Sequence, residues 1–158
     1  MEIRPAHPEE IDVVLDVLAD ASAWLRARGV EQWPERFERD WLMPAIGRGE
    51  TWLAEREGEV IGSLVVQWDD PIFWAGHKAD ARYLHRLVVA RHGEGLGAHL
   101  LRWAEAHAAA ADKPFLRLDC VAWNAPLRSY YERVGYQHVG DVTVGPYTQA
   151  QYEKRLGD

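Results

Sequence analysis

The stretch Arg91-His92-Gly93-Glu94-Gly95-Leu96-Gly97, which closely follows the segment Tyr83-Leu84-His85-Arg86-Leu87-Val88-Val89, decides the fold of this 158-residue chain. The earlier segment predicts a central strand, and the apolar face that starts at Leu96 predicts a helix over residues 97–111. A glycine-rich turn between a strand and a helix exposes several backbone N–H groups at the positive end of the helix dipole. We therefore expect this loop to hold a phosphate or a pyrophosphate.

The segments on either side of the loop alternate between strand and helix patterns. Upstream, we expect strands at 2–4, 51–55 and 60–68, and helices at 8–29 and 37–47, the second interrupted near Pro44. A turn at Glu57-Gly58 should join the last two strands into a hairpin, and Asp69-Asp70-Pro71 should end the second of them. Downstream, we expect strands at 115–121, 136–144 and 147–154, and a helix at 127–134. This order predicts an α+β fold: a mixed, mostly antiparallel sheet of six to seven strands flanked by about four helices, in a single domain over residues 1–158.

The composition is that of an acidic globular protein. Apolar residues make up 47% and charged residues 27% of the chain, which excludes a disordered or collagen-like protein. The formal charge of -7 argues against a nucleic-acid partner, because phosphate backbones are bound by clustered Lys and Arg. The chain shows neither a signal segment nor an apolar run long enough to span a membrane, so we expect a cytoplasmic protein with no membrane partner.

A single cysteine limits the chemistry further. Cys120 stands alone, so an internal disulfide and a cysteine-rich metal site are both excluded. We interpret it as a buried, inert thiol and expect no metal.

Three ligands compete for the glycine loop. A nucleoside triphosphate site of the P-loop kind needs Gly-Lys-Ser/Thr, where this chain has Ala98-His99. A dinucleotide site of an oxidoreductase fits the spacing G-x-G-x-x-A at residues 93–98, and Asp119 follows about 20 residues later. That fold, however, places the loop after its first strand, whereas here several elements come before it. Coenzyme A, whose pyrophosphate needs the same kind of loop, is the third candidate.

A second motif decides between these ligands. The segment Asn124-Ala125-Pro126-Leu127-Arg128-Ser129-Tyr130-Tyr131-Glu132-Arg133-Val134-Gly135-Tyr136 lies on the next predicted helix. Together with His92-Gly93-Glu94-Gly95-Leu96-Gly97 and the opening Ile3-Arg4-Pro5-Ala6, it resembles the GCN5-related N-acetyltransferase (GNAT) superfamily. The superfamily's loop motif is Gln/Arg-x-x-Gly-x-Gly/Ala, so His92 is a departure in the first position.

The resemblance implies an acyl-CoA N-acyltransferase fold and an acetyl-CoA-dependent N-acetyltransferase, with acetyl-CoA as co-substrate. In such enzymes the fourth strand bulges, and its backbone groups pair with the pantetheine arm. The residues that the resemblance assigns to coenzyme binding are Leu87, Val88, Val89, His92, Gly93, Glu94, Gly95, Leu96, Gly97, Ala98, Asn124 and Tyr131.

The resemblance also implies two catalytic roles. Tyr131 matches the family tyrosine near the coenzyme sulfur, and a phenol with a pKa of about 10 can donate a proton to a thiolate. His85 lies on a strand similar to that of arylalkylamine acetyltransferases and would take a proton from the incoming amine. The alternatives are that Tyr130 acts in place of Tyr131, that His85 is structural and water removes the proton, and that Asn124 only caps a helix.

The resemblance implies that the acceptor is a primary amine of a small molecule or a peptide. We expect the first two helices to supply its site, with Gln32, Trp33 and Trp41 as lining residues and further loops near Trp74 and Tyr147. Aromatic residues in an acidic protein suit a small cationic amine such as a polyamine, an aminoglycoside or an arylalkylamine. The family resemblance leaves a homodimer open, and the alternative function is a catalytically weak acyl-CoA-binding sensor or partner protein.

Overall fold

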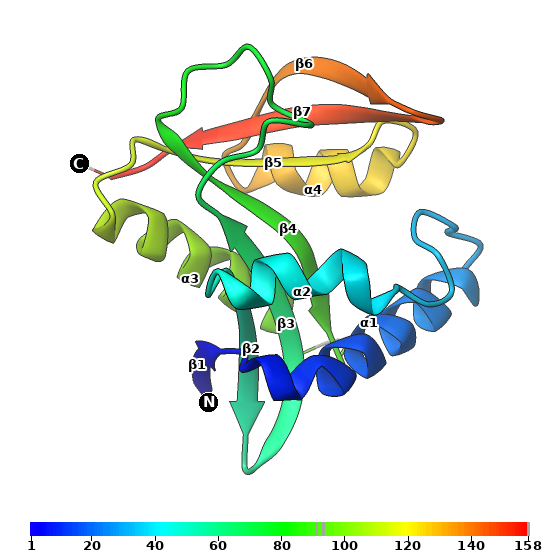
Figure 1. The fold of residues 1–158 in the computed structure, drawn as a ribbon. Coiled ribbons are helices and arrows are strands. Elements are labelled where there is room, and N and C mark those ends of the chain that lie inside the picture. The colour runs from blue at the N-terminus through cyan, green and yellow to red at the C-terminus, as the bar shows by residue number, and fades with distance from the viewer. Residues whose placement is uncertain (91, 93, 158) are drawn as a thin grey trace. The chain divides into compact units, whose positions relative to one another are not determined.

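The computed structural model describes residues 1–90, 92 and 94–157. The described residues form seven strands and four α-helices (Figure 1). Their bounds are β1 Glu2–Pro5, α1 Ile11–Arg26, α2 Arg39–Gly47, β2 Thr51–Arg56, β3 Glu59–Gln67, β4 Ala81–Val89, α3 Leu96–Ala110, β5 Phe115–Val121, α4 Ala125–Arg133, β6 Gln137–Val144 and β7 Tyr147–Arg155, with a 3-10 turn at Pro8–Glu10.

The strands follow the order β1-β2-β3-β4-β5-β7-β6 in one seven-stranded sheet. Strands β1 and β2, β2 and β3, β5 and β7, and β6 and β7 pair antiparallel, whereas β4 and β5 pair parallel. The parallel pair is joined through α3, as a strand–helix–strand crossover requires. The predicted α+β class, with its mixed and mostly antiparallel sheet and about four helices, is confirmed.

The chain divides into two compact units, and this division runs through β4 and α3. Unit 1 comprises Met1–Val66 and Arg86–Leu101, and unit 2 comprises Gln67–His85 and Arg102–Asp158. The expectation of a single domain over residues 1–158 stays a prediction.

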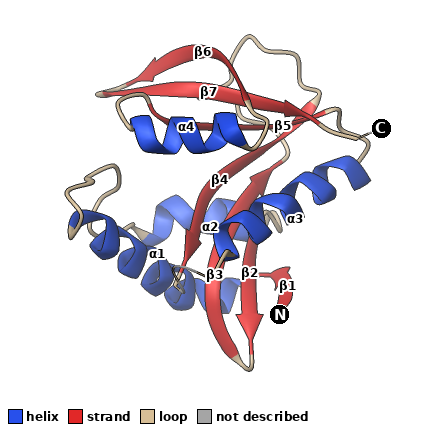
Figure 2. Ribbon diagram, turned by 180° about the vertical axis from the view of Figure 1, so that it is seen from behind, coloured by secondary structure: helices blue, strands red, loops and turns tan. Residues whose placement is uncertain are grey.

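In unit 1, helices α1 and α2 cover one face of β2 and β3 (Figure 1). Leu53 of β2 and Val88 of β4 share a buried cluster with Val14 and Leu18 of α1 and with Ile46 of α2. The opposite face meets the first turns of α3 (Figure 2), where Gly62 leaves so little room that an added Cβ would lie 3.1 Å from Leu100 Cδ1. Both faces of this part of the sheet are therefore buried, which explains why β3 is an almost continuous apolar run.

Helix α2 corrects one expectation. We expected an interruption near Pro44, but α2 runs through this residue from Arg39 to Gly47. Proline costs the helix one hydrogen bond, and burial of the neighbouring Ala45 and Ile46 offsets that loss. None of the helices in the described part of the chain is long and apolar enough to cross a membrane.

The β2–β3 and β6–β7 hairpins each have a two-residue turn, and the residues at these positions suit the turn type. Glu57 and Gly58 join β2 to β3 with φ of 54° and 78°, as a type I′ turn requires. Gly145 has a φ of 59° and is followed by Pro146 between β6 and β7, the pattern of a type II′ turn. The predicted turn at Glu57-Gly58 is thereby confirmed.

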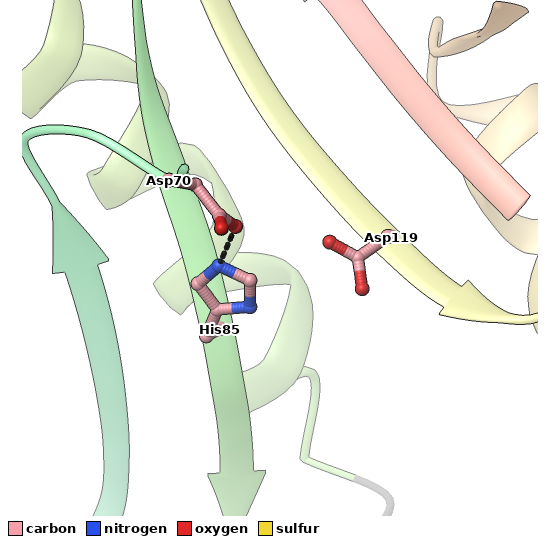
Figure 3. A group of neighbouring side chains, drawn as sticks. All are labelled: Asp70, His85 and Asp119. Atoms are coloured by element: carbon pink, nitrogen blue, oxygen red, sulfur yellow. Dashed lines mark hydrogen bonds and ion pairs between the residues drawn. The ribbon is translucent and has the colours of Figure 1, made fainter. Parts of the chain in front are cut away.

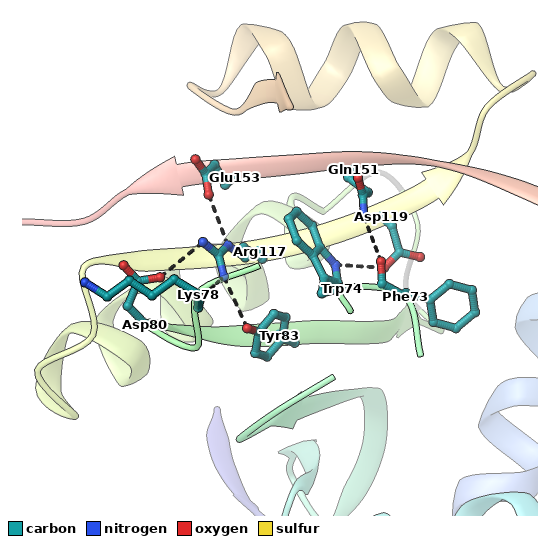
Figure 4. Close-up of polar contacts among 9 residues, drawn as sticks. All are labelled: Phe73, Trp74, Lys78, Asp80, Tyr83, Arg117, Asp119, Gln151 and Glu153. Atoms are coloured by element: carbon teal, nitrogen blue, oxygen red, sulfur yellow. Dashed lines mark hydrogen bonds and ion pairs between the residues drawn. The ribbon is translucent and has the colours of Figure 1, made fainter. Parts of the chain in front are cut away.

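In unit 2, a buried arginine joins the loop after β3 to the sheet (Figure 4). Arg117 of β5 donates hydrogen bonds to Glu153 Oε2 at 3.0 Å and to the Lys78 carbonyl at 2.6 Å. The same guanidinium reaches Asp80 Oδ1 at 3.1 Å and the Tyr83 hydroxyl at 3.2 Å. Its side chain is 6% exposed, so its donors depend on these partners instead of water.

We predict that Arg117→Met destabilises the fold. The substitution keeps most of the apolar stem but leaves two partly buried carboxylates, of Asp80 and Glu153, without their cation, so unfolding should become easier by about 3 kcal/mol. Urea denaturation followed by tryptophan fluorescence measures this change. The matched control is Arg39→Met, which breaks an exposed ion pair with Asp12 and should shift the free energy of unfolding by less than about 0.5 kcal/mol. Equal effects of the two variants would contradict a structural role for the buried network.

Candidate functional site

The glycine loop lies in unit 1 at the start of α3. Gly95 has a φ of 74°, a left-handed conformation that side chains other than glycine adopt at a cost. Its carbonyl accepts a hydrogen bond from the His99 N–H, and α3 begins at Leu96, so Gly97 and Ala98 belong to the first turn of the helix. The N–H groups of such a first turn are the ones an anion can use. Gly93, also assigned to coenzyme binding, lies outside the described residues.

Side-chain contacts fasten the loop within unit 1. The His92 ring stacks on Trp24 with a centroid distance of 3.9 Å and an interplanar angle of 6°. The Arg28 guanidinium lies 3.7 Å from the centroid of the same Trp24 ring. Burial and the nearby charge of Arg28 lower the pKa of His92, so this ring is neutral at neutral pH. On the other side of Gly93, Glu94 pairs with Arg56 at 3.1 Å.

Strand β4 is distorted where the resemblance predicts a bulge. Arg86 has a φ of 50°, which is rare for a residue with a side chain and marks a local break in the strand. The parallel ladder joins Ala81–Leu84 to Phe115–Leu118, so His85 and the following residues of β4 lie beyond the registered pairs. Val88 is buried in the core of unit 1, whereas Leu87 and Val89 are half-buried. Backbone groups of β4 that follow the break are thus available for purposes other than pairing with β5.

Tyr131 lies on α4 among other tyrosines of unit 2. Its ring is 5.5 Å from Tyr130, 5.7 Å from Tyr136 and 6.3 Å from Tyr152, centroid to centroid. The hydroxyl of Tyr136 donates to Glu105, and that of Tyr152 donates to Glu132. The Tyr131 hydroxyl bonds to no residue that the structure describes. Burial raises the pKa of Tyr131, with smaller contributions from Cys120 and Tyr130, so the phenol keeps its proton at neutral pH.

Asn124 caps helix α4. Its side-chain oxygen accepts a hydrogen bond from the Leu127 N–H at 3.2 Å, which satisfies one of the free donors of the first turn. The capping alternative is therefore real, and its assigned role in coenzyme binding stays a prediction.

His85 belongs to a cluster of three titratable side chains in unit 2 (Figure 3). Its Nε2 lies 2.7 Å from Asp70 Oδ2, and one ligand atom from each of Asp70, His85 and Asp119 lies within 4.8 Å of the others. Sequence reasoning missed Asp70, which stood only as part of the Asp69-Asp70-Pro71 stretch that ends β3. It also treated Asp119 as a dinucleotide ligand or a strand end. The local sequence held a weak signal for Asp70, an aspartate followed by proline, which is typical of a turn.

The same three side chains are a set that could hold a metal ion. Imidazole and carboxylate donors suit Zn²⁺ and similar ions. Both oxygens of Asp70, however, already accept hydrogen bonds, from His85 and from the N–H groups of Ile72 and Phe73. A metal would have to displace the imidazole contact to use Asp70 Oδ2.

Only some of the residues expected to line the acceptor site lie close to one another. In unit 1, the Phe37 ring meets Trp33 at 6.1 Å and Trp41 at 6.2 Å, and the Arg86 guanidinium lies 5.6 Å from its centroid. Trp41 is half exposed and Trp33 packs against the core. In unit 2, Trp74 is buried against Ala81 and Tyr83, so it is a core residue and not an open lining residue.

Cys120 is a buried free thiol, and burial raises its pKa to about 11. It is therefore protonated and unreactive at neutral pH, as expected of an inert thiol.

Comparisons with known proteins agree with these features. The model of the acetyltransferase (GNAT) family matches residues 18–136. A curated relative, the uncharacterized N-acetyltransferase YesJ of Bacillus subtilis (strain 168), is 32% identical over 146 residues, which cover 86% of this chain and 81% of the relative.

Two solved structures extend the likeness. An acetyltransferase of the GNAT family from Listeria monocytogenes is 30% identical with a TM-score of 0.84, and the match covers 98% of this chain and 94% of that one. The PaiA N-acetyltransferase from Thermoplasma acidophilum, solved in complex with coenzyme A, is 21% identical with a TM-score of 0.73 over 98% of both chains, and shows the fold alone. The chain therefore belongs to the acetyltransferase (GNAT) family and is an acetyl-CoA-dependent N-acetyltransferase.

Proposed function

We propose that this chain transfers an acetyl group from acetyl-CoA to a primary amine of a small molecule or a peptide, by direct attack in a ternary complex. The observation that carries the proposal is the break of β4 at Arg86, followed by the glycine loop that opens α3. This order leaves backbone donors and acceptors of one strand for a ligand and sets a helix N-terminus directly after it. The PaiA N-acetyltransferase, whose similar fold was solved in complex with coenzyme A, supports the same use of the fold.

Acetyl-CoA binding uses mainly backbone groups. Leu87, Val88 and Val89 would pair with the pantetheine arm, because they follow the break in β4. The loop and the first turn of α3 would hold the pyrophosphate with residues His92, Gly93, Glu94, Gly95, Leu96, Gly97 and Ala98. Asn124 and Tyr131 would complete the coenzyme contacts from α4.

The reaction is a displacement at the thioester carbonyl. The amine nitrogen attacks the carbonyl carbon, the new C–N bond forms and the C–S bond breaks. The coenzyme A thiolate leaves and takes up one proton, and the nitrogen loses one. A covalent acetyl-cysteine intermediate is disfavoured, because the chain's single cysteine, Cys120, is a buried thiol whose pKa is raised to about 11.

Tyr131 is the proposed donor to the leaving sulfur. Its raised pKa means that it holds its proton more tightly than an ordinary phenol does. Its first contribution is therefore a hydrogen bond to the thiolate as negative charge develops there, with proton transfer following. The free hydroxyl distinguishes it from Tyr136 and Tyr152, whose hydroxyls are already engaged.

His85 is the proposed base for the amine. Its side chain is 17% exposed, so one edge of the ring can still be reached. A neutral imidazole near an incoming ammonium can accept its proton and so release the lone pair for attack.

The loop assignment predicts a loss of coenzyme binding in Gly95→Ala. The methyl group forces the left-handed backbone at this position to relax, which should turn the loop N–H groups away from the pyrophosphate and raise the Kd for acetyl-CoA about tenfold. Calorimetric titration with acetyl-CoA, with NADH in parallel, measures this.

Gly49→Ala is the matched control, since Gly49 has nearly the same φ, 75°, and equally open surroundings. It should leave the Kd unchanged. Unaltered binding in Gly95→Ala would remove the loop from the coenzyme site, and NADH binding by the wild type would revive the dinucleotide alternative.

The proton-donor assignment predicts a slower reaction in Tyr131→Phe. Loss of the hydroxyl should lower kcat about 100-fold, within the usual range for a general acid, and leave the Kd for acetyl-CoA unchanged. Release of the coenzyme A thiol in the presence of primary amines measures kcat. Tyr130→Phe, its neighbour on α4, is the control and should keep full activity; the opposite pattern would assign the role to Tyr130. A wild type that binds acetyl-CoA tightly but releases no thiol would identify a sensor instead of an enzyme.

A further inference from the structure

The carboxylate of Asp70 is fixed on both sides. Its Oδ1 accepts hydrogen bonds from the N–H groups of Phe73 at 2.9 Å and Ile72 at 3.2 Å, and its Oδ2 lies 2.7 Å from His85 Nε2. The side chain is 4% exposed. Burial alone raises the pKa of Asp70, but the contacts with His85 and the two backbone donors outweigh burial and lower it. Asp70 is therefore an ionised carboxylate with a fixed orientation at neutral pH.

The loop that carries Asp70 is held firmly within unit 2 (Figure 4). Gln151 of β7, itself buried, donates to the Phe73 carbonyl at 2.7 Å. The Trp74 ring fills the small core between this loop and β4, and Arg117 binds the Lys78 carbonyl further along. These contacts fix the position of Asp70 independently of His85. The orientation of the His85 ring therefore adjusts to the carboxylate.

This geometry selects one form of the imidazole. A carboxylate only accepts hydrogen bonds, so the ring nitrogen facing Asp70, Nε2, must carry the hydrogen. In the neutral ring the other nitrogen, Nδ1, is then the base. Figure 3 shows Nδ1 on the side of the ring that faces Asp119. Asp70 thus leaves the lone pair of His85 on the side of the ring where the second carboxylate of the cluster lies.

Asp119 lies on the same side of the ring as Nδ1 (Figure 3). It receives one long hydrogen bond, 3.4 Å, from the Trp74 indole N–H among the residues that the structure describes. Burial, and to a smaller extent the negative charge of Asp70, raise the pKa of Asp119, while His85 acts in the opposite direction. The cluster thus places two carboxyl groups beside one imidazole in a half-buried site, where a bound cation would interact favourably with both carboxyl groups.

We infer that Asp70, His85 and Asp119 receive the acceptor as a protonated primary amine: Asp119 binds the ammonium group, His85 Nδ1 takes its proton, and Asp70 is the positioning residue that fixes the ring. The inference rests on the proposed acetyl transfer and names its substrate class, a cationic amine. One N–H bond of the ammonium breaks and one Nδ1–H bond forms. The imidazolium that results is stabilised by Asp70, and the neutral amine is free to attack the thioester.

The positioning role can be tested without any substrate. In Asp70→Asn the amide oxygen can keep the two backbone hydrogen bonds, but the amide N–H₂ group now faces His85 and should force Nε2 to become the acceptor. Long-range ¹H–¹⁵N correlation spectra distinguish the two neutral tautomers of histidine, and His85→Gln assigns the signal. We expect the Nε2–H form in the wild type and the Nδ1–H form in Asp70→Asn. An unchanged tautomer, or an Nδ1–H form in the wild type, would overturn the positioning role.

The substrate class can be tested with two nearly isosteric acceptors. Phenethylamine is protonated at neutral pH, whereas the amino group of O-benzylhydroxylamine is neutral and needs no base. With phenethylamine, Asp70→Asn and His85→Gln should lower kcat about 100-fold, and Asp119→Asn should raise KM about tenfold. With O-benzylhydroxylamine, each variant should stay within about threefold of the wild type. If a variant instead lowered the acetylation rates with both acceptors equally, the defect would be structural and the inference would be overturned.

Two controls separate the remaining outcomes. Asp69→Asn removes the same charge from the exposed neighbouring residue and should leave both reactions unchanged. Tight Zn²⁺ binding by the wild type that is lost in Asp70→Asn and Asp119→Asn would make the cluster a metal site and overturn the inference. If the wild type acetylates neither acceptor, the proposed function fails for small amines and the ammonium role of Asp119 fails with it, while the tautomer spectra still decide the role of Asp70.

Discussion

The buried guanidinium of Arg117 is the contact on which the arrangement of unit 2 depends. It joins β5, which carries it, to Glu153 on β7 and to Lys78 and Asp80 in the loop after β3. Because a buried arginine without partners is very costly, these groups have little freedom to move apart. The loop that begins near Asp70 is therefore tied to the sheet by these contacts, although it has no regular structure. A rigid loop is what a carboxylate needs if it is to fix the orientation of a neighbouring side chain.

Strand β4 serves two purposes along its length. Up to Leu84 it pairs with β5 in the ordinary way, and at Arg86 a positive φ distorts the strand, which then continues to Val89 beyond the registered pairs with β5. His85 lies at the change, where a side chain can leave the pattern of alternating faces. A positive φ at Arg86 has a cost of order 1 kcal/mol, which the surrounding packing must offset. Such strain is expected at functional sites more than elsewhere. Here the strained Arg86 directly follows His85, the residue that the sequence suggests as a base.

Sequence reasoning reached the sheet, the helices and the glycine loop because these depend on local patterns. Periodicity located α1 and α3, and Glu57-Gly58 located a hairpin, since the physical cause lies within a few residues. The partnership of Asp70 with His85 depends on how a loop folds back over the sheet, which periodicity does not encode. Trp74 shows the same limit: an aromatic residue in a loop suggested a binding surface, yet Arg117 and Tyr83 make it part of a small core.

The titratable groups of unit 2 lie in environments that give them different protonation states at neutral pH. Burial keeps the protons on the Tyr131 phenol and the Cys120 thiol, so neither carries charge at neutral pH. Asp70 is the opposite case, because its hydrogen bonds outweigh its burial and hold it ionised. A group that keeps its proton, such as the Tyr131 phenol, can donate that proton to a leaving group. A group that stays ionised, such as Asp70, can stabilise a neighbouring base that accepts a proton. Acetyl transfer from a thioester to an ammonium needs both, since the nitrogen must lose one proton before it attacks and a second as the amide forms, while the sulfur gains one. The separation of these pKa values thus supports the proposal that proton transfer uses side chains of unit 2.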